Sequence, residues 1–117
     1  MMLFHFKKRK EQTNLSLRRK LNIAIDSLGG SEREVFQSLK LLDVKGYIGS
    51  RTQCPVARYL KEVLSEEVVC IMVRDDQITI CPRNFVPIFS VDNPLQIGHF
   101  VRLFDRETYP DLVLKIP

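Results

Sequence analysis

The fold class is decided by residues 68–80, VVCIMVRDDQITI, where the spacing of the apolar residues changes. Upstream of this stretch, apolar residues recur every three or four positions, as on one face of a helix. Within it, Gln77 to Ile80 alternates polar and apolar residues, and Arg74-Asp75-Asp76 supplies a turn between two strand-like runs. The stretch therefore predicts an antiparallel hairpin. Because Val68 to Val73 is apolar throughout, we expect the first strand to be covered on both faces or to be a central strand of the sheet.

Three helices are predicted before the hairpin, each from apolar residues at helical spacing. These residues are Leu17, Leu21, Ala24, Ile25 and Leu28 in the first, Val35, Phe36, Leu39 and Leu42 in the second, and Val56, Tyr59, Leu60, Val63 and Leu64 in the third. Asn14 or Ser16 can cap the first helix. Ser31 and Glu34 form a capping box for the second, and Pro55 suits the first turn of the third. The expected helix ends are Gly29-Gly30, Gly46 and the neighbourhood of Ser65.

The residues after the hairpin predict one more strand and one more helix. Phe85 to Phe89 is expected to form a third strand at an edge of the sheet, because Pro87 cannot donate to a strand ladder. Asn93 can cap a fourth helix, and Leu112 to Ile116 is apolar enough to pack on the core as a short strand. The chain is thus predicted to be an α+β protein with three N-terminal helices, a small antiparallel sheet of two or three strands, and one C-terminal helix.

Basic residues are concentrated at the N-terminus of this chain of 117 residues, whose formal net charge is +4. They are Lys7, Lys8, Arg9, Lys10, Arg18, Arg19 and Lys20, with Glu11 as the one acidic residue among the first 20. The remaining chain holds 11 basic and 13 acidic residues, so it is mildly acidic. We interpret residues 1–12 as a flexible basic arm and residues 13–117 as a single domain. Such an arm can contact nucleic acid, an anionic membrane or an acidic protein surface.

Cys54 is the one candidate for enzymatic chemistry. At the start of the third helix, the helix dipole and Arg51 would favour its thiolate. A thiol nucleophile also needs a base, and His99, 45 residues away, is the only imidazole in the predicted domain. The alternative is that Cys54 is a small residue packed beneath the loop and His99 a partly buried, hydrogen-bonded side chain. Gly98 inside a helix indicates the close approach of another backbone segment.

No enzymatic activity, cofactor, metal site or small-molecule substrate is predicted. The chain has no Gly-rich phosphate loop, nucleophile elbow, HExxH or CxxC motif. Its three cysteines are Cys54, Cys70 and Cys81, an odd number without a secretory signal, which predicts reduced thiols in a cytoplasmic protein. Cys70 lies in an apolar run, where we expect it to be a small buried hydrophobe. No apolar run approaches the roughly 20 residues that cross a bilayer.

Protein binding, including self-association, is the function that we expect. The candidate contact residues are Tyr47, Ile48, Phe85 and Phe89, because the apolar residues of the chain exceed what one small core holds. The alternative is nucleic-acid association through the N-terminal basic residues, since three helices followed by a hairpin is the order of a winged helix-turn-helix. The long connection from Val44 to Cys54 and the acidic hairpin tip, Asp75-Asp76, weigh against that alternative.

Two segments resemble those of short, uncharacterised bacterial single-domain proteins. The first joins Gly46-Tyr47-Ile48-Gly49 to Cys54-Pro55-Val56-Ala57-Arg58-Tyr59-Leu60, and the second joins Phe100-Val101-Arg102-Leu103-Phe104-Asp105 to Tyr109-Pro110-Asp111-Leu112. They occur in the same order, with a β-rich stretch between them, over residues 40–112. The resemblance implies a compact single domain and no known activity. The segment around Phe85 to Asp92 is longer than in the family pattern.

Overall fold

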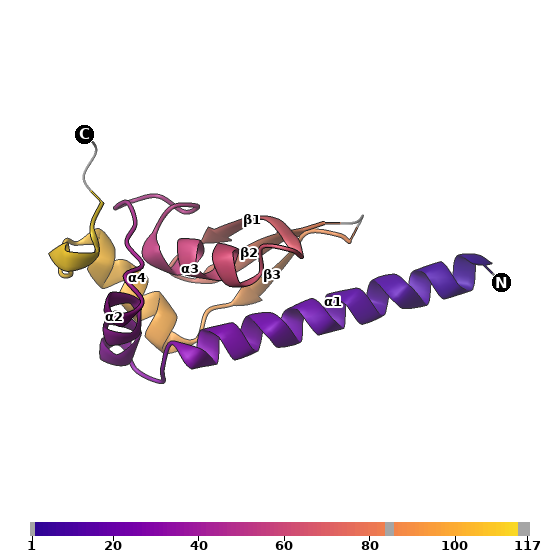
Figure 1. Ribbon diagram of the computed structural model, residues 1–117, viewed down its shortest axis with the longest axis horizontal. Helices are drawn as coiled ribbons and strands as arrows, with labels where there is room; N and C mark the ends of the chain where they lie inside the picture. Colours follow the sequence, from indigo (N-terminus) through magenta and orange to yellow (C-terminus); the bar gives the residue numbers. More distant parts are fainter. Residues whose placement is uncertain (1, 84–85, 115–117) are drawn as a thin grey trace.

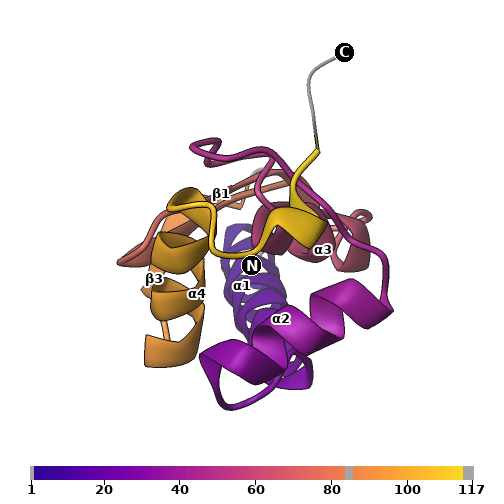
Figure 2. The same cartoon turned by 90° about the vertical axis from the view of Figure 1, so that its left-hand side faces the viewer.

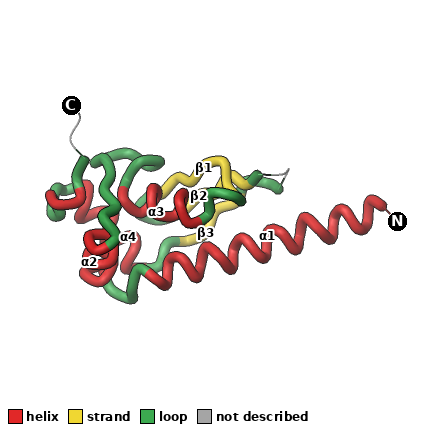
Figure 3. Tube along the Cα trace, viewed as in Figure 1, coloured by secondary structure: helices red, strands yellow, loops and turns green. Residues whose placement is uncertain are grey.

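The computed structural model describes residues 2–83 and 86–114, and their side chains from residue 15 onward. In chain order, the elements are α1 (Met2–Ser27), α2 (Glu32–Leu41), α3 (Pro55–Val63), β1 (Val68–Val73), β2 (Gln77–Pro82), β3 (Phe89–Asp92), α4 (Leu95–Asp105) and the 3-10 helix η1 (Pro110–Leu112). Figure 3 distinguishes them from the loops, of which the α2–α3 connection is long. The predicted α+β class, with helices before the sheet and one helix after it, is confirmed.

The three strands form one antiparallel sheet in the order β1-β2-β3. Ile80 of β2 pairs with Ile71 on one side and with Phe89 on the other. Seen end-on, the strands arch over α1 (Figure 2). The side chains on the inner face are buried, namely Val68, Ile71, Val73, Ile78, Ile80 and Phe89. The expectation that β1 is covered on both faces is wrong, because β1 is an edge strand and its Val69 side chain is 54% exposed.

Helix α1 is longer than predicted. It begins at Met2, so Asn14 and Ser16 lie inside the helix and do not cap it. No glycine or proline precedes Gly29, and nothing in the sequence therefore stops the helix from extending toward the N-terminus. The buried stripe of α1 is the predicted one, Leu17, Leu21, Ala24, Ile25 and Leu28. The N-terminal half of the helix extends past the sheet (Figure 1). The division into a flexible arm over residues 1–12 and a domain over 13–117 stays a prediction.

The loop between α2 and α3 starts earlier than predicted. The Ser31 cap is confirmed, since its Oγ accepts from the Glu34 N–H at 3.2 Å, but the Glu34 carboxylate accepts from the Gly30 N–H. Helix α2 ends at Leu41, and Asp43 takes a φ of 55° just beyond it. Gly46 lies within the loop instead of ending the helix. Its N–H donates to the Leu112 carbonyl at 2.9 Å, which ties the loop to the C-terminal segment.

Three predictions for the second half of the chain are wrong. Strand β3 spans Phe89–Asp92 and not residues 85–89; Phe85 lies outside the described residues. Helix α4 begins at Leu95 with Pro94 as its N-cap; the Asn93 Nδ2 donates to the Arg74 carbonyl, and its Oδ1 accepts no hydrogen bond from the helix. The C-terminal segment packs on the core as predicted, with Leu112 buried, but it forms η1 and a single parallel bridge between Val113 and Gly46 instead of a strand. Residues 115–117 lie outside the described part of the chain.

Candidate functional site

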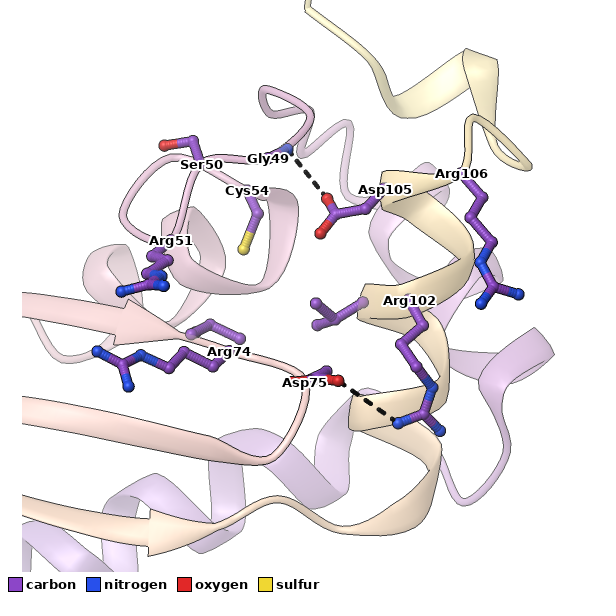
Figure 4. Close-up of a pocket in the computed structure, with 11 residues that line it drawn as sticks. Gly49, Ser50, Arg51, Cys54, Arg74, Asp75, Arg102, Asp105 and Arg106 are labelled. Atoms are coloured by element: carbon purple, nitrogen blue, oxygen red, sulfur yellow. Dashed lines mark hydrogen bonds and ion pairs between the residues drawn. The ribbon is translucent and has the colours of Figure 1, made fainter.

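A pocket of about 450 Å³ lies between the loop before α3, the β1–β2 hairpin and the C-terminal half of α4 (Figure 4). Two hydrogen bonds hold the loop in place. The Val73 N–H donates to the Arg51 carbonyl at 2.8 Å, which joins the loop to the edge of β1. The Gly49 N–H donates to Oδ1 of Asp105 at 3.0 Å, which joins the loop to α4. The walls of the pocket therefore come from segments far apart in the sequence that are fastened to one another.

The tip of the hairpin is held on α4. The Asp75 carbonyl oxygen occupies the space where a Cβ at position 98 would lie, so the prediction that Gly98 marks a close backbone approach is confirmed. The Asp75 carboxylate also lies 3.9 Å from Nη1 of Arg102. Both carboxylates of the pocket thus have partners within the protein, Asp75 on α4 and Asp105 on the loop.

Four arginines give the pocket a positive lining. They are Arg51, Arg74, Arg102 and Arg106, and all are exposed. Against the two aspartates they leave a formal excess of two positive charges. Within the described part of the chain, Arg51, Arg74 and Arg106 make no ion pair. Figure 4 shows Arg51 and Arg74 extending toward the same side of the pocket, and Arg106 turned away from it. Both of these guanidinium groups lie at the edge of the pocket that faces away from α4.

Cys54 is the N-cap residue of α3 and lies in the wall of the pocket. Its side chain is only 3% exposed. The pKa of the thiol is raised to about 11, mainly because burial disfavours the charged thiolate. A hydrogen bond from the Ala57 backbone lowers the pKa in part, and the negative charge of Asp105 raises it. Figure 4 places the sulfur opposite the Asp105 carboxylate. The hypothesis of an activated thiolate is therefore not supported, because desolvation outweighs the helix terminus. The structure agrees with the alternative, in which Cys54 is a small residue packed beneath the loop.

His99 is not a base for Cys54. The prediction of a partly buried histidine is wrong: residues 97, 98, 100 and 101 face the core and leave His99 exposed on the solvent side of α4. It is not part of the pocket lining. Among the described residues, no three His, Cys, Asp or Glu side chains gather in a way that could hold a metal ion. Nor does any helix in the searched part of the chain combine the length and apolarity needed to cross a membrane.

The predicted protein-contact residues do not form one surface. Tyr47 and Ile48 are half-buried in the α2–α3 loop, where Ile48 packs against the core. Phe89 is 8% exposed on the inner face of the sheet, and the Arg18 guanidinium lies 4.2 Å from the centroid of its ring. Phe85 lies outside the described residues. Whether any of them contacts a partner stays a prediction.

The predicted basic contact residues are only partly described. Arg18 stacks on Phe89, and the Lys20 ammonium pairs with the Glu67 carboxylate. Arg19 is exposed. The side chains of Lys7, Lys8, Arg9 and Lys10 lie outside the described residues. The structure thus assigns two of the described basic side chains to contacts within the fold.

Sequence reasoning singles out only one of the four pocket arginines, Arg51, and only beside Cys54. Arg74 belongs to the predicted turn and Arg102 to a segment of the family resemblance. The spacing of Arg102 and Arg106 does place both on one face of α4. Nothing local indicates that this face meets the hairpin and the α3 loop, because those contacts are tertiary.

Comparison of the chain with protein-family models, with curated proteins and with solved structures found no match. The resemblance to short bacterial single-domain proteins therefore stays a prediction.

Proposed function

We propose that the protein is a non-enzymatic binding module that takes an acidic segment of a partner protein into the arginine-lined pocket. The observation that carries the proposal is the excess of guanidinium groups over available carboxylates. Both pocket aspartates are engaged within the protein, whereas Arg51 and Arg74 have no ion-pair partner in the described residues. A guanidinium keeps its charge at physiological pH and offers planar, paired donors that match a carboxylate.

The lining favours a protein partner over a nucleic acid. Val73 and Val101 add apolar surface between the charged groups. Arginine beside apolar side chains is a composition typical of protein interfaces. The hairpin tip packs on α4 through Gly98, so it is not free to enter a nucleic-acid groove as a wing does.

The binding role, as opposed to an enzymatic one, is supported by the state of Cys54. The raised pKa of its thiol keeps it protonated at neutral pH, and the exposed His99 lies outside the pocket. Neither a thiolate nor an imidazole therefore lies beside the arginines. Cytoplasmic location is part of the same proposal and is supported by three cysteines that are all free.

A peptide selection tests the proposal. A random peptide library displayed on phage is panned against the immobilised full chain, and enriched sequences are synthesised. We expect acidic residues next to an apolar one, and an affinity that falls about tenfold or more in the Arg51→Ala/Arg74→Ala variant, since charge-assisted hydrogen bonds are lost. The control is Arg33→Ala/Arg58→Ala, which removes the same charge from exposed positions outside the pocket. Equal losses in both variants would reduce the effect to general charge attraction and contradict the proposal.

Self-association is a special case of this proposal, in which the acidic segment belongs to a second copy. The mass of the chain in solution, measured by light scattering across a range of concentrations, separates the two cases. A dimer that dissociates in the Arg51→Ala/Arg74→Ala variant assigns the pocket to self-association. A monomer that binds the selected peptides assigns it to a different partner.

Nucleic-acid association is the second candidate, favoured by the basic residues of α1. Seven basic residues fall within the first 20, and the N-terminal half of α1 extends past the sheet (Figure 1). Fluorescence anisotropy with short duplex DNA and RNA tests this. A steep loss of affinity with salt, abolished when residues 7–10 are replaced by glutamine, supports the candidate. Absence of binding at low salt removes it.

A further inference from the structure

Two of the three cysteines face each other on the open side of the sheet. Cys70 of β1 is the register partner of Cys81 in the antiparallel β1–β2 ladder, and both side chains are half-buried. Directly opposed residues in such a ladder have Cα atoms roughly 4.5–5.5 Å apart. A disulfide requires Cα atoms about 4.4–6.8 Å apart. The backbone therefore already holds this pair at the separation that a disulfide needs.

The regular part of the β1–β2 ladder places the two cysteines on the same face. Ile71 and its partner Ile80 point into the core, so Cys70 and Cys81, one position away, point outward. A β-bulge precedes Cys70: Val69 is the extra residue, which lets Val68 face the core as well. The prediction that Cys70 is a buried hydrophobe is wrong, because its side chain is only half-buried.

The two thiols lie close enough to interact. The Cys70 side chain is the main cause of a raised pKa of Cys81, about 11, and desolvation adds to the rise. The Lys61 ammonium is close enough to act on Cys81 in the opposite sense, and it donates to the Val69 carbonyl at the bulge.

We propose that Cys70 and Cys81 are a modification site, at which a hydroperoxide converts the two thiols into an intramolecular disulfide. The Cys70 sulfur attacks the peroxide oxygen, the O–O bond breaks, and Cys70 becomes a sulfenic acid while one water leaves. The Cys81 sulfur then attacks the Cys70 sulfur, the S–O bond breaks, and a second water leaves as the S–S bond forms. Two electrons pass from the thiols to hydrogen peroxide, and both thiol protons end in water.

Cys54 should not be oxidised by the peroxide, because it is buried and has no cysteine partner across a strand. Its sulfur is buried in the wall of the pocket, and its side chain is almost inaccessible. The modification site shares no residue with the arginine-lined pocket. The inference therefore does not depend on the proposed function.

Mass spectrometry of the full chain tests the inference. The reduced protein is treated with hydrogen peroxide, then unfolded and alkylated. We expect the mass to fall by two hydrogens and the number of alkylated cysteines to fall from three to one, Cys54. Trypsin cleaves after Arg74, between the paired cysteines, so the disulfide should join two peptides. Dithiothreitol should restore all three thiols.

Three results would overturn the inference: three alkylated cysteines after peroxide, a disulfide that contains Cys54 or joins two chains, or added oxygen at Cys70 or Cys81 without an S–S bond. The Cys54→Ala variant should form the disulfide as the wild type does, and the Cys70→Ser variant should not. Because the peptide map uses the wild-type chain, the test stands even where a variant fails to fold. Slower formation in urea is also expected, since unfolding separates the pair; equal rates would contradict the role of the fold.

Discussion

The carbonyl oxygen of Asp75 lies where a Cβ of residue 98 would be, so the tip of the β1–β2 hairpin rests directly on the backbone of α4. This contact has a consequence for the pocket. It fixes the hairpin relative to α4 and so places Arg74, next to the tip, on the same pocket as Arg102. The absence of a side chain at Gly98 is thus a condition for the arginine-lined site.

The Gly98→Ala substitution should destabilise the protein, although alanine is the better helix former. The added methyl would collide with backbone, which cannot rotate away as a side chain can, and overpacking of this kind costs about 1–3 kcal/mol. Helix propensity returns at most about 1 kcal/mol. Urea unfolding measures the net loss. Gly30→Ala is the matched control, because nothing lies within 4 Å of a Cβ there. Equal stability of the two variants would contradict the close approach.

Two serine substitutions distinguish a helix cap from a helix interior. Ser31→Ala should cost about 1 kcal/mol, since the Ser31 Oγ accepts from the Glu34 N–H at the start of α2. Ser16→Ala should be neutral or raise stability by about 0.5 kcal/mol, because Ser16 lies inside α1 and alanine has the higher helix propensity. Thermal unfolding of both variants gives the comparison. A loss at Ser16 as large as that at Ser31 would place the start of the helix near residue 16 instead.

Local sequence signals predicted helix starts and strand faces well where no long-range hydrogen bond engages the same side chain. The Ser31 cap, the start of α3 at Pro55 and the inward Ile78 and Ile80 depend on neighbours within a few residues. Asn93 failed as a cap because the bond from its Nδ2 to the Arg74 carbonyl orients the side chain across the hairpin, and its Oδ1, the capping acceptor, has no partner. Competition of this kind cannot be seen in a local pattern.

The candidate sites were less predictable than the elements. Cys70 lies in an apolar run that does not show which residues face the core, and the bulge at Val69 interrupts the alternation just before it. The pocket gathers arginines from a loop, a hairpin and a helix, so it exists only once those segments pack. Cys54 was correctly placed at a helix start. Its burial, which decides the pKa of its thiol, depends on the whole fold.

The pH dependence of stability should reveal the buried Cys54 thiol. Its pKa is raised from 9.0 to about 11 in the folded protein because burial disfavours the thiolate. The protonated Cys54 thiol therefore contributes to the free energy of unfolding. This contribution is fully present below the pKa of the unfolded state and is lost as the pH rises toward the pKa of the folded state, by up to about 3 kcal/mol. Urea unfolding between about pH 8 and about pH 11 should therefore show a steeper decline for the wild type than for Cys54→Ala. Parallel declines would mean that Cys54 is accessible in the folded state.

Tyr109 should anchor the C-terminal segment through ring stacking. Its ring centroid lies 4.4 Å from that of Phe36 on α2 and 5.3 Å from that of Phe100 on α4. Tyr109→Ala removes both contacts and should cost about 2–3 kcal/mol, below the loss for a fully buried aromatic residue because Tyr109 is half-buried. Tyr109→Phe keeps the ring and should stay within about 0.5 kcal/mol of the wild type. If phenylalanine and alanine cost the same in urea unfolding, the hydroxyl and not the stacking holds the segment.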